Sequence, residues 1–496
     1  MICRIVTLFV FLFSVLPVFS QNCGVSHENQ LQWLPKYLKH LNNPNANLPS
    51  LSMAEHKVPI VFHLVARNNG VGRAKVETAL TVLCELNELF AASNISFYLT
   101  PNGLNFINHD GIFTNSHFVV NQLAMQSERR DSALNIFVVN SVGGGNVVGL
   151  YDANKDWVLV QRSVFTEGNK TTAHEIGHFF SLLHPHFGWD GSAWNPAIHG
   201  NPAPIISPDG QTPTERMDGS NCEIAGDFLC DTAPDYNFGI GWQQSCNYDG
   251  MALSPDSIAV NPDESLIMSY FNDNCRQKFS AEQSVLMSLD LEDESRAYLH
   301  SNSIPNNDAV AFPIVLTTPS GTTQISSNSV AFEWESVANA AYYYVEYDRS
   351  SAFNLDPKGE VVTQNSVSII HDWLPNLTYY WRIFAWNETS FCSPPSAVNT
   401  FSLDIVSSIN SVLVNEPNWV RLIKSSDNYA IDYQLTEPQK MKFEIYSLTG
   451  KVCFSEIVDF SVGKGERSVN LPYLQQGIYI AAFHGQTTYT QRLLIY

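Results

Sequence analysis

A short histidine-rich stretch, residues 172–184, constrains this chain more than any other part of it. If the stretch is helical, His174 and His178 lie four residues apart, so both imidazoles leave the same face about one turn apart. Two imidazoles at that spacing can bind one Zn²⁺, and Glu175 then lies where it can act on a metal-bound water. The apolar residues that follow predict that the helix is buried, and buried polar side chains need a partner.

A third histidine separates two interpretations of this stretch. By itself, the pattern His-Glu-x-x-His also occurs in ordinary buried helices, with histidines in the core and the glutamate at the surface. His184 follows His178 by six residues, which is the spacing of the long zinc motif in which the chain turns back after the second ligand. That motif has glycine at the turn, whereas this chain has Ser181, which makes the turn more costly. We therefore predict that three histidines bind zinc.

Length, charge and the N-terminus limit the classes of protein. The chain has 496 residues, too many for one ordinary domain, and its formal net charge of −21 argues against partners such as nucleic acid or an anionic membrane. Residues 1–20 predict a signal peptide, because Arg4 precedes an apolar run that ends before Gln21. That run is short for a membrane anchor. We expect a secreted or cell-surface protein with no transmembrane segment in the mature chain.

The cysteines suit an exported chain, in which disulfides can form. Of nine cysteines, Cys3 falls in the predicted signal peptide, and four gather between positions 222 and 275, where we expect two disulfides. Cys84 lies in a predicted helix and is expected to be a buried thiol. Residues 21–56 predict a pro-segment or N-terminal arm, in which Cys23 precedes a glycine. Cys23 either takes the open position of a zinc ion and keeps an enzyme latent, or forms a disulfide, or is an idle thiol.

Residues 57–300 have the pattern of an α+β domain. Alternating or continuous apolar runs predict strands at 58–65, 94–99, 133–139 and 156–162, and helical periodicity predicts helices at 73–92 and 281–299. The strand at 156–162 precedes the histidine helix, where it either pairs with an extended substrate or is an ordinary edge strand. Regular pattern is lost after His184, which predicts an irregular segment below the strands and helices.

Two further features lie in the irregular segment. Asp227, Asp231 and Asp235 fall in a turn-rich stretch whose carboxylate oxygens suit Ca²⁺, although aspartate is also common in turns that hold no ion. Farther on, Met268 lies in a predicted tight turn, and a methionine after a zinc helix is typical of the turn whose thioether lies beneath the metal. Tyr270 would then point its phenol at the metal or at a developing oxyanion.

Together these motifs resemble the pappalysin/cytophagalysin family of metzincin zinc metallopeptidases. The matching segments are HEIGHFFSLLH at 174–184, DGSNC at 218–222 leading into GDFLCDT at 226–232, and IMSY at 267–270 followed by Cys275. The resemblance covers residues 58 to about 300 and implies a metzincin-like fold, which is a twisted mixed sheet with a backing helix and an active-site helix above an irregular lower subdomain. It implies that zinc is bound by His174, His178 and His184, that Glu175 is the catalytic base, that Met268 forms the Met-turn, and that Tyr270 lines the site. Ser181 is the clearest departure from the family pattern.

The same resemblance implies three further properties. It implies two disulfides in the lower subdomain, Cys246–Cys275 and Cys222–Cys230. It implies calcium near the segment that holds Asp227, Asp231 and Thr232. Some members of the family are kept latent by a pro-segment cysteine followed by glycine, which is similar to Cys23 and the residue after it.

The last 190 or so residues have a different pattern, of short strands with aromatic residues at alternate positions. Residues 301–311 predict a linker, and 312–403 an all-β sandwich that resembles a fibronectin type III domain, used as a spacer or, less directly, for carbohydrate or matrix binding. Residues 406–496 predict a second all-β sandwich, which resembles the C-terminal sorting domain of the type IX secretion system. The second resemblance implies export across the outer membrane of a Bacteroidota-like bacterium and contact with its secretion machinery.

These features predict a secreted zinc endopeptidase that acts on protein or peptide substrates and is expected to be a monomer. In such an enzyme a zinc-bound water attacks the peptide carbonyl, and Glu175 takes its proton and passes it to the leaving amine. The alternative is a non-catalytic surface binding or adhesion protein with a structural metal site. Glu175 favours the enzyme, because a structural site has no use for that acid.

Overall fold

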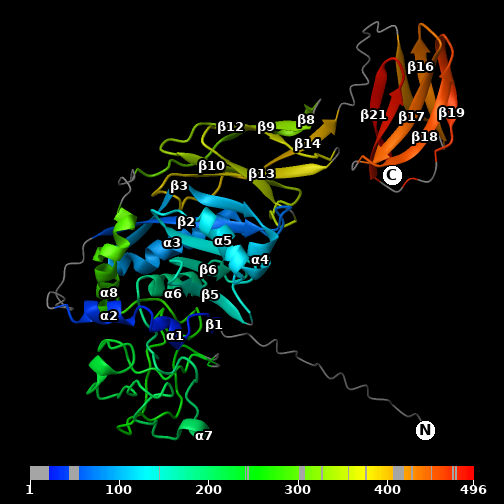
Figure 1. Cartoon of the computed structure of the whole chain (residues 1–496). Helices are drawn as coiled ribbons and strands as arrows, with labels where there is room; N and C mark the ends of the chain where they lie inside the picture. The colour runs from blue at the N-terminus through cyan, green and yellow to red at the C-terminus, as the bar shows by residue number, and fades with distance from the viewer. Residues whose placement is uncertain are drawn as a thin grey trace, which may run out of the picture. The chain divides into compact units, whose positions relative to one another are not determined.

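The computed structural model describes residues 22–43, 55–300, 308–405 and 418–495, apart from 145, 241, 243, 244, 326, 327, 356, 375, 376, 426, 427, 448, 449, 472, 473, 475 and 476. It divides into two compact units, residues 1–404 and 405–496 (Figure 1). The predicted signal peptide and residues 301–307 of the predicted linker lie outside the described residues. Within these ranges, no helix has both the length and the apolar character needed to cross a membrane.

A mixed sheet of six strands is the framework of the first unit. Its strands, in spatial order, are β1 (Asn22–Cys23), β5 (Val147–Asp152), β6 (Trp157–Gln161), β4 (Leu134–Val139), β2 (His56–Ala66) and β3 (Ile95–Asn108). Only β5 and β6 are antiparallel to each other, and the other neighbours are parallel. β2 and β4 are buried along almost their whole length. They lie in the middle of the sheet and are covered on both faces, which explains their continuous apolar sequence.

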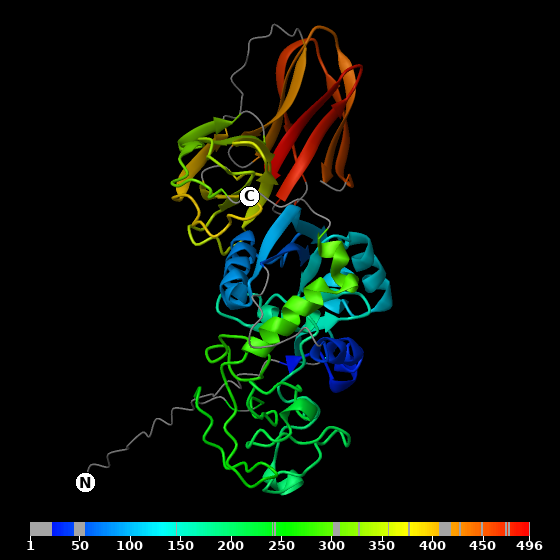
Figure 2. The same cartoon turned by 90° about the vertical axis from the view of Figure 1, so that its left-hand side faces the viewer.

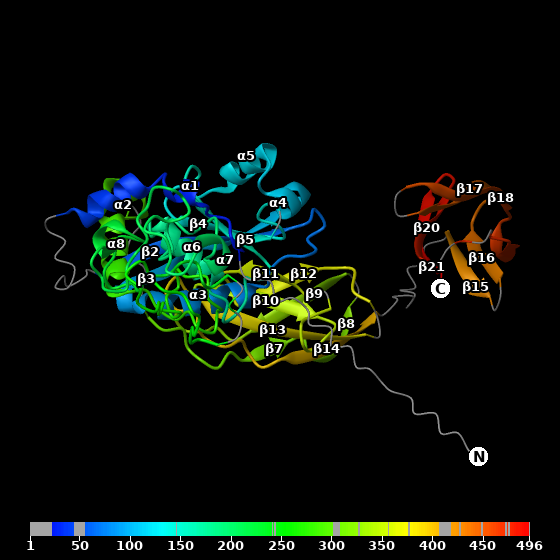
Figure 3. The same ribbon diagram turned by 90° about the horizontal axis from the view of Figure 1, so that it is seen from below.

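Helices cover the two faces of this sheet (Figure 3). On one face, α3 (Val76–Phe90) and α6 (Thr171–Phe179) share a core with alternate side chains of β2. On the other face, α4 (Asp110–Asn115) and α5 (Val119–Glu128) pack on a smaller apolar cluster. α8 (Ala281–Glu292) begins with a capping box at Ser280 and continues into a 3-10 helix, η3 (Glu294–His300). The predicted helix at 281–299 is therefore an α-helix followed by a 3-10 helix.

The N-terminal arm, residues 22–43, lies next to β5 and to the histidines of α6. It contains strand β1 and two short helices, α1 (His27–Gln30) and α2 (Leu34–Leu41). β1 pairs with the sheet edge formed by β5, and α2 packs against α8 (Figure 2). Between α6 and α8 the chain forms the irregular lower part, whose regular elements in the described residues are α7 (Pro196–His199) and the 3-10 helix η2 (Cys222–Ile224).

The prediction for residues 156–162 is wrong in its position within the sheet. This strand, β6, lies between β5 and β4, so it is neither an edge strand nor free to pair with a substrate. The edge on this side is β1 of the N-terminal arm, and β5, which follows the glycines at 143 and 144 and pairs antiparallel with β6, would be the edge without the arm. Residues 147–152 are mostly half-buried and include Gly149, so they do not form a continuous apolar run. Their sequence therefore does not predict a strand.

Two sheets form a β-sandwich in residues 316–405. One sheet has the order β11 (Lys358–Val362), β10 (Tyr342–Asp348), β13 (Thr378–Trp386), β14 (Asn399–Ile405) and β8 (Gly321–Ile325). The other has the order β12 (Ser366–Ile370), β9 (Ser329–Trp334) and β7 (Leu316–Thr318). Aromatic side chains such as Phe332, Trp334 and Trp381 fill the core between them. The alternate aromatics of the sequence are thus core residues, as the pattern predicted.

This sandwich is joined to the helical domain covalently and through a shared core. Cys84 of α3 forms a disulfide with Cys392, so the prediction of a buried free thiol at Cys84 is wrong. The two cysteines are 308 residues apart, and no local pattern connects them. Arg382 of β13 also pairs with Glu77 of α3 at 2.7 Å. Both contacts explain why the first unit includes this sandwich.

The second unit is a separate all-β sandwich. One sheet has the order β15 (Trp419–Ser425), β16 (Asn428–Leu435) and β19 (Gly463–Val469). The other has the order β18 (Val452–Phe460), β17 (Gln439–Ser447), β20 (Gly477–His484) and β21 (Thr488–Ile495). Its core includes Phe443 and Phe483, whose rings stack with centroids 4.6 Å apart.

Candidate metal centre and active site

Three histidines meet at the end of α6 with the spacing of ligands around one ion. The Nε2 atom of His184 lies 3.2 Å from that of His174 and 3.0 Å from that of His178, and all three side chains are buried. Ligands about 2.0–2.1 Å from a tetrahedral zinc are themselves about 3.3 Å apart. The three nitrogens of this cluster, the histidine cluster, therefore fit a single Zn²⁺.

The second nitrogen of each histidine is held by an acceptor. Nδ1 lies 2.9 Å from the Ile267 carbonyl in His174, 2.9 Å from the Leu182 carbonyl in His178, and 2.5 Å from Asp190 Oδ1 in His184. Because carbonyl oxygens only accept, Nδ1 carries the proton and Nε2 is left with its lone pair directed at the ion position. Burial lowers the pKa of His184 to about 4 and that of His174 and His178 well below the usual value. The imidazoles are therefore neutral, as metal binding requires.

Ser181 performs the turn that a glycine would otherwise make. Its φ is 67°, in the left-handed region that favours glycine, and this turn brings His184 back to the first two histidines. The Ser181 hydroxyl donates a hydrogen bond of 2.5 Å to Asp290, a carboxylate that also pairs with Lys36 of the arm at 2.6 Å and with Arg296 at 2.8 Å. A hydrogen bond to a buried charge offsets the cost of the left-handed backbone.

Cys23 lies at the open side of the histidine cluster. Its Sγ is 3.6 Å from His178 Nε2, and ligand atoms of Cys23 and the three histidines all lie within 4.8 Å of one another. Cys23 is not in a disulfide, so that alternative is wrong. Burial, and then the charge of Glu175, raise the pKa of the Cys23 thiol. Cys23 would therefore become a thiolate only where a bound cation displaces its proton.

Main-chain and side-chain contacts hold the arm in place. β1 runs parallel to β5, and the Gly24 N–H donates to the Gly149 carbonyl at 2.7 Å. Gln30 accepts a hydrogen bond from the His184 N–H at 2.9 Å and donates one to Asp190 at 2.7 Å. The arm thus occupies the sheet edge beside α6 and touches both the third histidine and the carboxylate that orients it.

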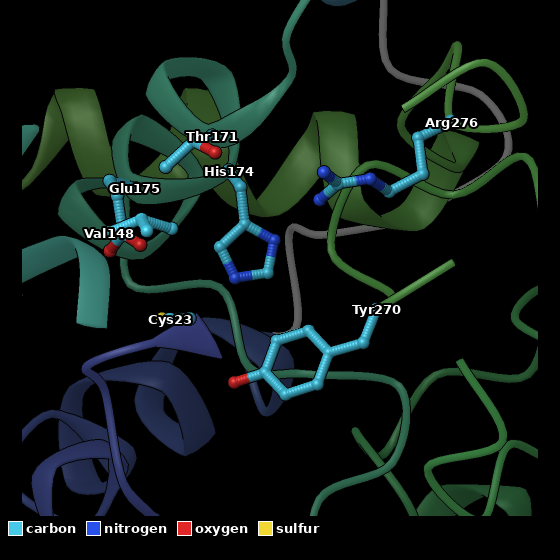
Figure 4. Close-up of a pocket in the computed structure, with 7 residues that line it drawn as sticks. All are labelled: Cys23, Val148, Thr171, His174, Glu175, Tyr270 and Arg276. Atoms are coloured by element: carbon cyan, nitrogen blue, oxygen red, sulfur yellow. The ribbon is translucent and has the colours of Figure 1, made fainter. Parts of the chain in front are cut away.

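Glu175, Met268 and Tyr270 surround the histidines as predicted by the motif (Figure 4 shows Glu175, His174 and Tyr270). Glu175 is fully buried, its two carboxylate oxygens have no hydrogen-bond partner in the described part of the chain, and burial raises its pKa to about 8. The Tyr270 ring centroid lies 4.8 Å from that of His184. Met268 is buried beneath α6, and a Cβ at Gly177 would collide with its sulfur, so the glycine leaves room for the methionine side chain.

Buried carboxyl groups form a second cluster in the irregular lower part. Asp227 Oδ1 accepts a hydrogen bond of 2.7 Å from Thr232, whereas its Oδ2 has no partner in the described residues. Glu215 and Asp235 are buried beside it, and we call Glu215, Asp227 and Asp235 the carboxyl cluster. Burial is the main cause that raises the pKa of Asp227 to about 7 and that of Glu215 to about 10, and the neighbouring acids add to it.

The three residues predicted to bind calcium, Asp227, Asp231 and Thr232, have different hydrogen-bond partners. Asp227 and Thr232 face each other in the carboxyl cluster, but Asp231 turns to α8. Its Oδ1 accepts from the Ser280 hydroxyl at 2.7 Å, and its Oδ2 accepts from the Glu282 N–H at 2.8 Å. Asp231 thus caps the N-terminus of α8, where a negative charge is stabilising.

Both disulfides implied for the lower part are confirmed, Cys222–Cys230 and Cys246–Cys275. Sequence reasoning missed three groups of this region: Asp190, which orients His184, Glu215 of the carboxyl cluster, and Arg276, which lines a pocket beside Glu175. Asp190 carried one usable signal, since ligand histidines commonly donate to a nearby carboxylate. The other two lie in loops without periodicity.

A comparison with known families identifies the C-terminal unit. Residues 425–496 match the family described as "Secretion system C-terminal sorting domain". The match confirms the prediction of a type IX sorting domain, and with it export of this protein to the cell surface or the medium and contact with the secretion machinery. No curated protein matches the chain.

Solved structures that resemble parts of the chain contain fibronectin type III domains. The FN1–FN3 domains of chicken CNTN1 are 12% identical over 38% of this chain and 69% of theirs, with a TM-score of 0.16. An fn3 domain of human contactin 1 is 21% identical over 22% and 93%, with a TM-score of 0.17. A two-domain segment of chicken tenascin is 11% identical over 37% and 98%, with a TM-score of 0.15. TM-scores this low carry no argument about the protein.

Proposed function

We propose that the protein is a secreted, zinc-dependent endopeptidase of the metzincin type, similar to the pappalysin/cytophagalysin family. The observation that carries the proposal is the convergence of three buried, neutral imidazole nitrogens beside a buried carboxyl group that has no hydrogen-bond partner in the described residues. A structural zinc site is closed by its ligands and needs no such acid. A hydrolase needs a base at this place.

Zinc supplies Lewis acidity when bound, and it lowers the pKa of a bound water towards about 7. His174, His178 and His184 would hold it through Nε2. A positive charge held by the histidines would favour the ionised form of Glu175, whose carboxylate accepts a proton from the water that attacks the peptide carbonyl and then delivers it to the leaving amine. Tyr270 is placed to donate its phenol hydrogen to the oxygen that becomes negative, because burial raises the pKa of Tyr270 well above its usual value and keeps it protonated.

The edge strand β5 supplies the main-chain groups that position an extended peptide. In the full chain these groups are engaged by β1 of the arm, and the Cys23 sulfur faces the ion position. We therefore propose that the arm keeps the enzyme latent, with Cys23 as the fourth zinc ligand, and that removal of the arm frees both the ion and the edge strand.

The carboxyl cluster is proposed as a calcium site. Glu215 and Asp227 are buried acids with no cationic partner among the described residues, and Asp235 has only His186 at 3.7 Å; a hard divalent cation with oxygen ligands relieves the cost of their burial. Asp227, Thr232 and Asp235 belong to the predicted stretch, Glu215 extends it, and Asp231 serves α8 instead. Calcium here has a structural role, because the cluster lies outside the pocket that holds Glu175.

The alternative function is a non-catalytic surface binding or adhesion protein, in which the fibronectin-like sandwich acts and the metal is structural. Export through a sorting domain fits either function. Glu175 favours the peptidase, since a structural site gains nothing from a buried acid next to its ligands.

Hydrolysis of a denatured protein tests the proposal. The chain, activated by limited proteolysis of its arm, is compared with Glu175→Ala and with the same sample after zinc chelation and after zinc is restored. We expect hydrolysis by the wild type, a loss of at least about 1,000-fold in Glu175→Ala without loss of zinc, and recovery on zinc addition. Equal rates in all samples would contradict the proposal.

A further inference from the structure

A small pocket lies beside Glu175, between the sheet edge and the turn that contains Met268. Cys23 and Val148 line it on the side of β1 and β5, and Thr171, His174 and Glu175 of α6 line another side. Tyr270 and Arg276 close it on the side of the Met-turn (Figure 4). Its volume is about 10 Å³, which is room for about one water molecule.

Arg276 is fixed at this pocket by its contacts. Its side chain is 3% exposed, and one terminal nitrogen lies 2.5 Å from Asp273 Oδ1. The other terminal nitrogen donates to the carbonyls of Ile267 and Ser269, both at 3.3 Å. The guanidinium therefore cannot swing out to solvent without leaving two carbonyls of the Met-turn, and its positive charge is a fixed part of the pocket.

Asp273 is held from the opposite side by the start of α6. Its Oδ1 accepts from the Lys170 N–H and its Oδ2 from the Asn169 side chain, each at 2.9 Å. The Arg276–Asp273 pair thus connects the Met-turn to the first turn of the zinc helix. The Asp273 carboxylate is thus already paired with one cation, Arg276.

Thr171 adds a polar group that needs a partner. It is 3% exposed, and its Oγ1 has no hydrogen-bond partner among the described residues. A buried hydroxyl without a partner costs free energy, which a ligand can recover by hydrogen bonding to it. The pocket thus offers a short side chain one hydroxyl partner and a fixed positive charge.

We propose that this pocket receives the substrate side chain next to the cleaved bond and that Arg276 sets its selectivity. The inference rests on the proposed peptidase function. Cys23 of the arm lies at the pocket because β1 pairs with β5. A substrate strand that replaces the arm on β5 therefore places one of its side chains at the same point. The space that Cys23 vacates when the arm leaves admits a side chain about as short as its own, Thr171 favours a polar or acidic one, and the charge of Arg276 excludes lysine and arginine.

Replacement of Arg276 should change the selectivity in a defined direction. Arg276→Ala enlarges the pocket and leaves the Asp273 carboxylate facing it. A substrate lysine or arginine can then enter and pair with Asp273, as Arg276 does now. Asp273→Asn in the same chain keeps an oxygen for the Lys170 N–H but removes the charge, so the gain for basic side chains should disappear.

Cleavage profiling with a peptide library tests this inference on the full chain activated by proteolysis of its arm. We expect wild type to disfavour lysine and arginine by at least about tenfold, relative to serine and aspartate, at one position that flanks the cleaved bond. In Arg276→Ala, kcat/KM for basic residues at that position should rise about tenfold or more, and Arg276→Ala/Asp273→Asn should lose the gain. Arg162→Ala, an arginine outside the pocket lining, serves as the matched control and should keep the wild-type profile.

Two results would overturn the inference: enrichment of lysine or arginine next to the bond cut by wild type, or a folded Arg276→Ala variant whose profile is unchanged. If Arg276→Ala does not fold, the wild-type profile alone decides. Absence of hydrolysis in wild type, equal to that of Glu175→Ala, would instead contradict the proposed peptidase function. Binding of the same peptides to Glu175→Ala then still reports whether the pocket rejects basic side chains.

Discussion

The histidine cluster and the carboxyl cluster are both buried, but burial prepares them for a metal in opposite ways. Burial favours the neutral form of each group, so it lowers the pKa of His184 to about 4 and raises that of Glu215 to about 10. A neutral imidazole is a ready ligand, whereas a neutral carboxyl group must lose its proton first. The histidine cluster is therefore ready for zinc at neutral pH, and the carboxyl cluster accepts a cation only in exchange for protons.

The N-terminal arm also treats the two clusters differently. At the histidine cluster it presents a possible ligand, Cys23, and a hydrogen bond from Gln30 to Asp190. At the carboxyl cluster it presents only the Tyr37 hydroxyl, which donates to the Asp227 carbonyl at 2.5 Å. Loss of the arm should therefore change the ligands available at the histidine cluster and leave the side-chain oxygens of the carboxyl cluster unchanged.

The largest expected effect comes from removing one ligand of each cluster. His178→Ala should lose zinc and reduce hydrolysis by at least about 1,000-fold, because the two imidazoles that remain are too few to hold the ion. Glu215→Gln should lose calcium but keep one equivalent of zinc. Metal content by mass spectrometry of both purified variants checks this, and loss of zinc from Glu215→Gln would show that the two clusters are not independent.

A smaller effect is a pH dependence of stability that calcium reverses. The folded pKa values of Asp227, about 7, and Glu215, about 10, lie above the ordinary values of these acids. Without a cation, their contribution to the free energy of unfolding is therefore greatest below about pH 4 and is lost as the pH rises from there to the folded pKa values. Calcium binds the charged form, so its stabilisation should grow with pH. We expect the Tm to rise by at least about 3 °C on calcium addition at pH 8 and by less at pH 5.

Calorimetry of the chain in chelator and in calcium measures this difference. Glu215→Gln is the matched control, because it removes the proton that the cation must displace. Its Tm in chelator should fall less with pH, and calcium should not raise it. A calcium effect on Tm that is equal at pH 5 and pH 8 would contradict the assignment of these acids as ligands.

The smallest effect concerns Ser181, which belongs to the histidine cluster only through the backbone. Ser181→Gly loses the hydrogen bond to Asp290 but relieves the left-handed backbone, two terms of about 1 kcal/mol each that oppose one another. We expect full zinc binding and equal or higher activity. Ser181→Ala loses the bond without the relief and should be about 1–2 kcal/mol less stable by urea unfolding. Zinc loss in Ser181→Gly would show that the turn is misinterpreted.

The two clusters also differ in how far the sequence could predict them. The three histidines, Glu175 and Met268 follow from spacing on one helix and one turn, and the structure brings them together. In the carboxyl cluster, Glu215 lies twelve residues before Asp227 in a segment without periodicity, so nothing in the chain connects the two before it folds. Asp231 has the same residue type as its neighbour but is used by α8.

The same limit applies to the framework. β2, β4 and β6 are apolar runs and were predicted, whereas β5, half-buried and interrupted by Gly149, was not. The partner of Cys84 could not be predicted either, because Cys392 lies in the β-sandwich and the pairing depends on how the two domains pack. Local pattern predicts elements, but edge position, long-range disulfides and ligand sets from loops depend on tertiary packing.

X-ray absorption spectroscopy at the zinc edge tests the central claim most directly. In the full chain, we expect one zinc per molecule with three nitrogen ligands and one sulfur ligand, from the histidine cluster and Cys23. In Cys23→Ala the sulfur should be replaced by an oxygen ligand while the three nitrogens remain. Absence of stoichiometric zinc, or a shell with fewer than three nitrogens in both proteins, would contradict a catalytic zinc site at these histidines.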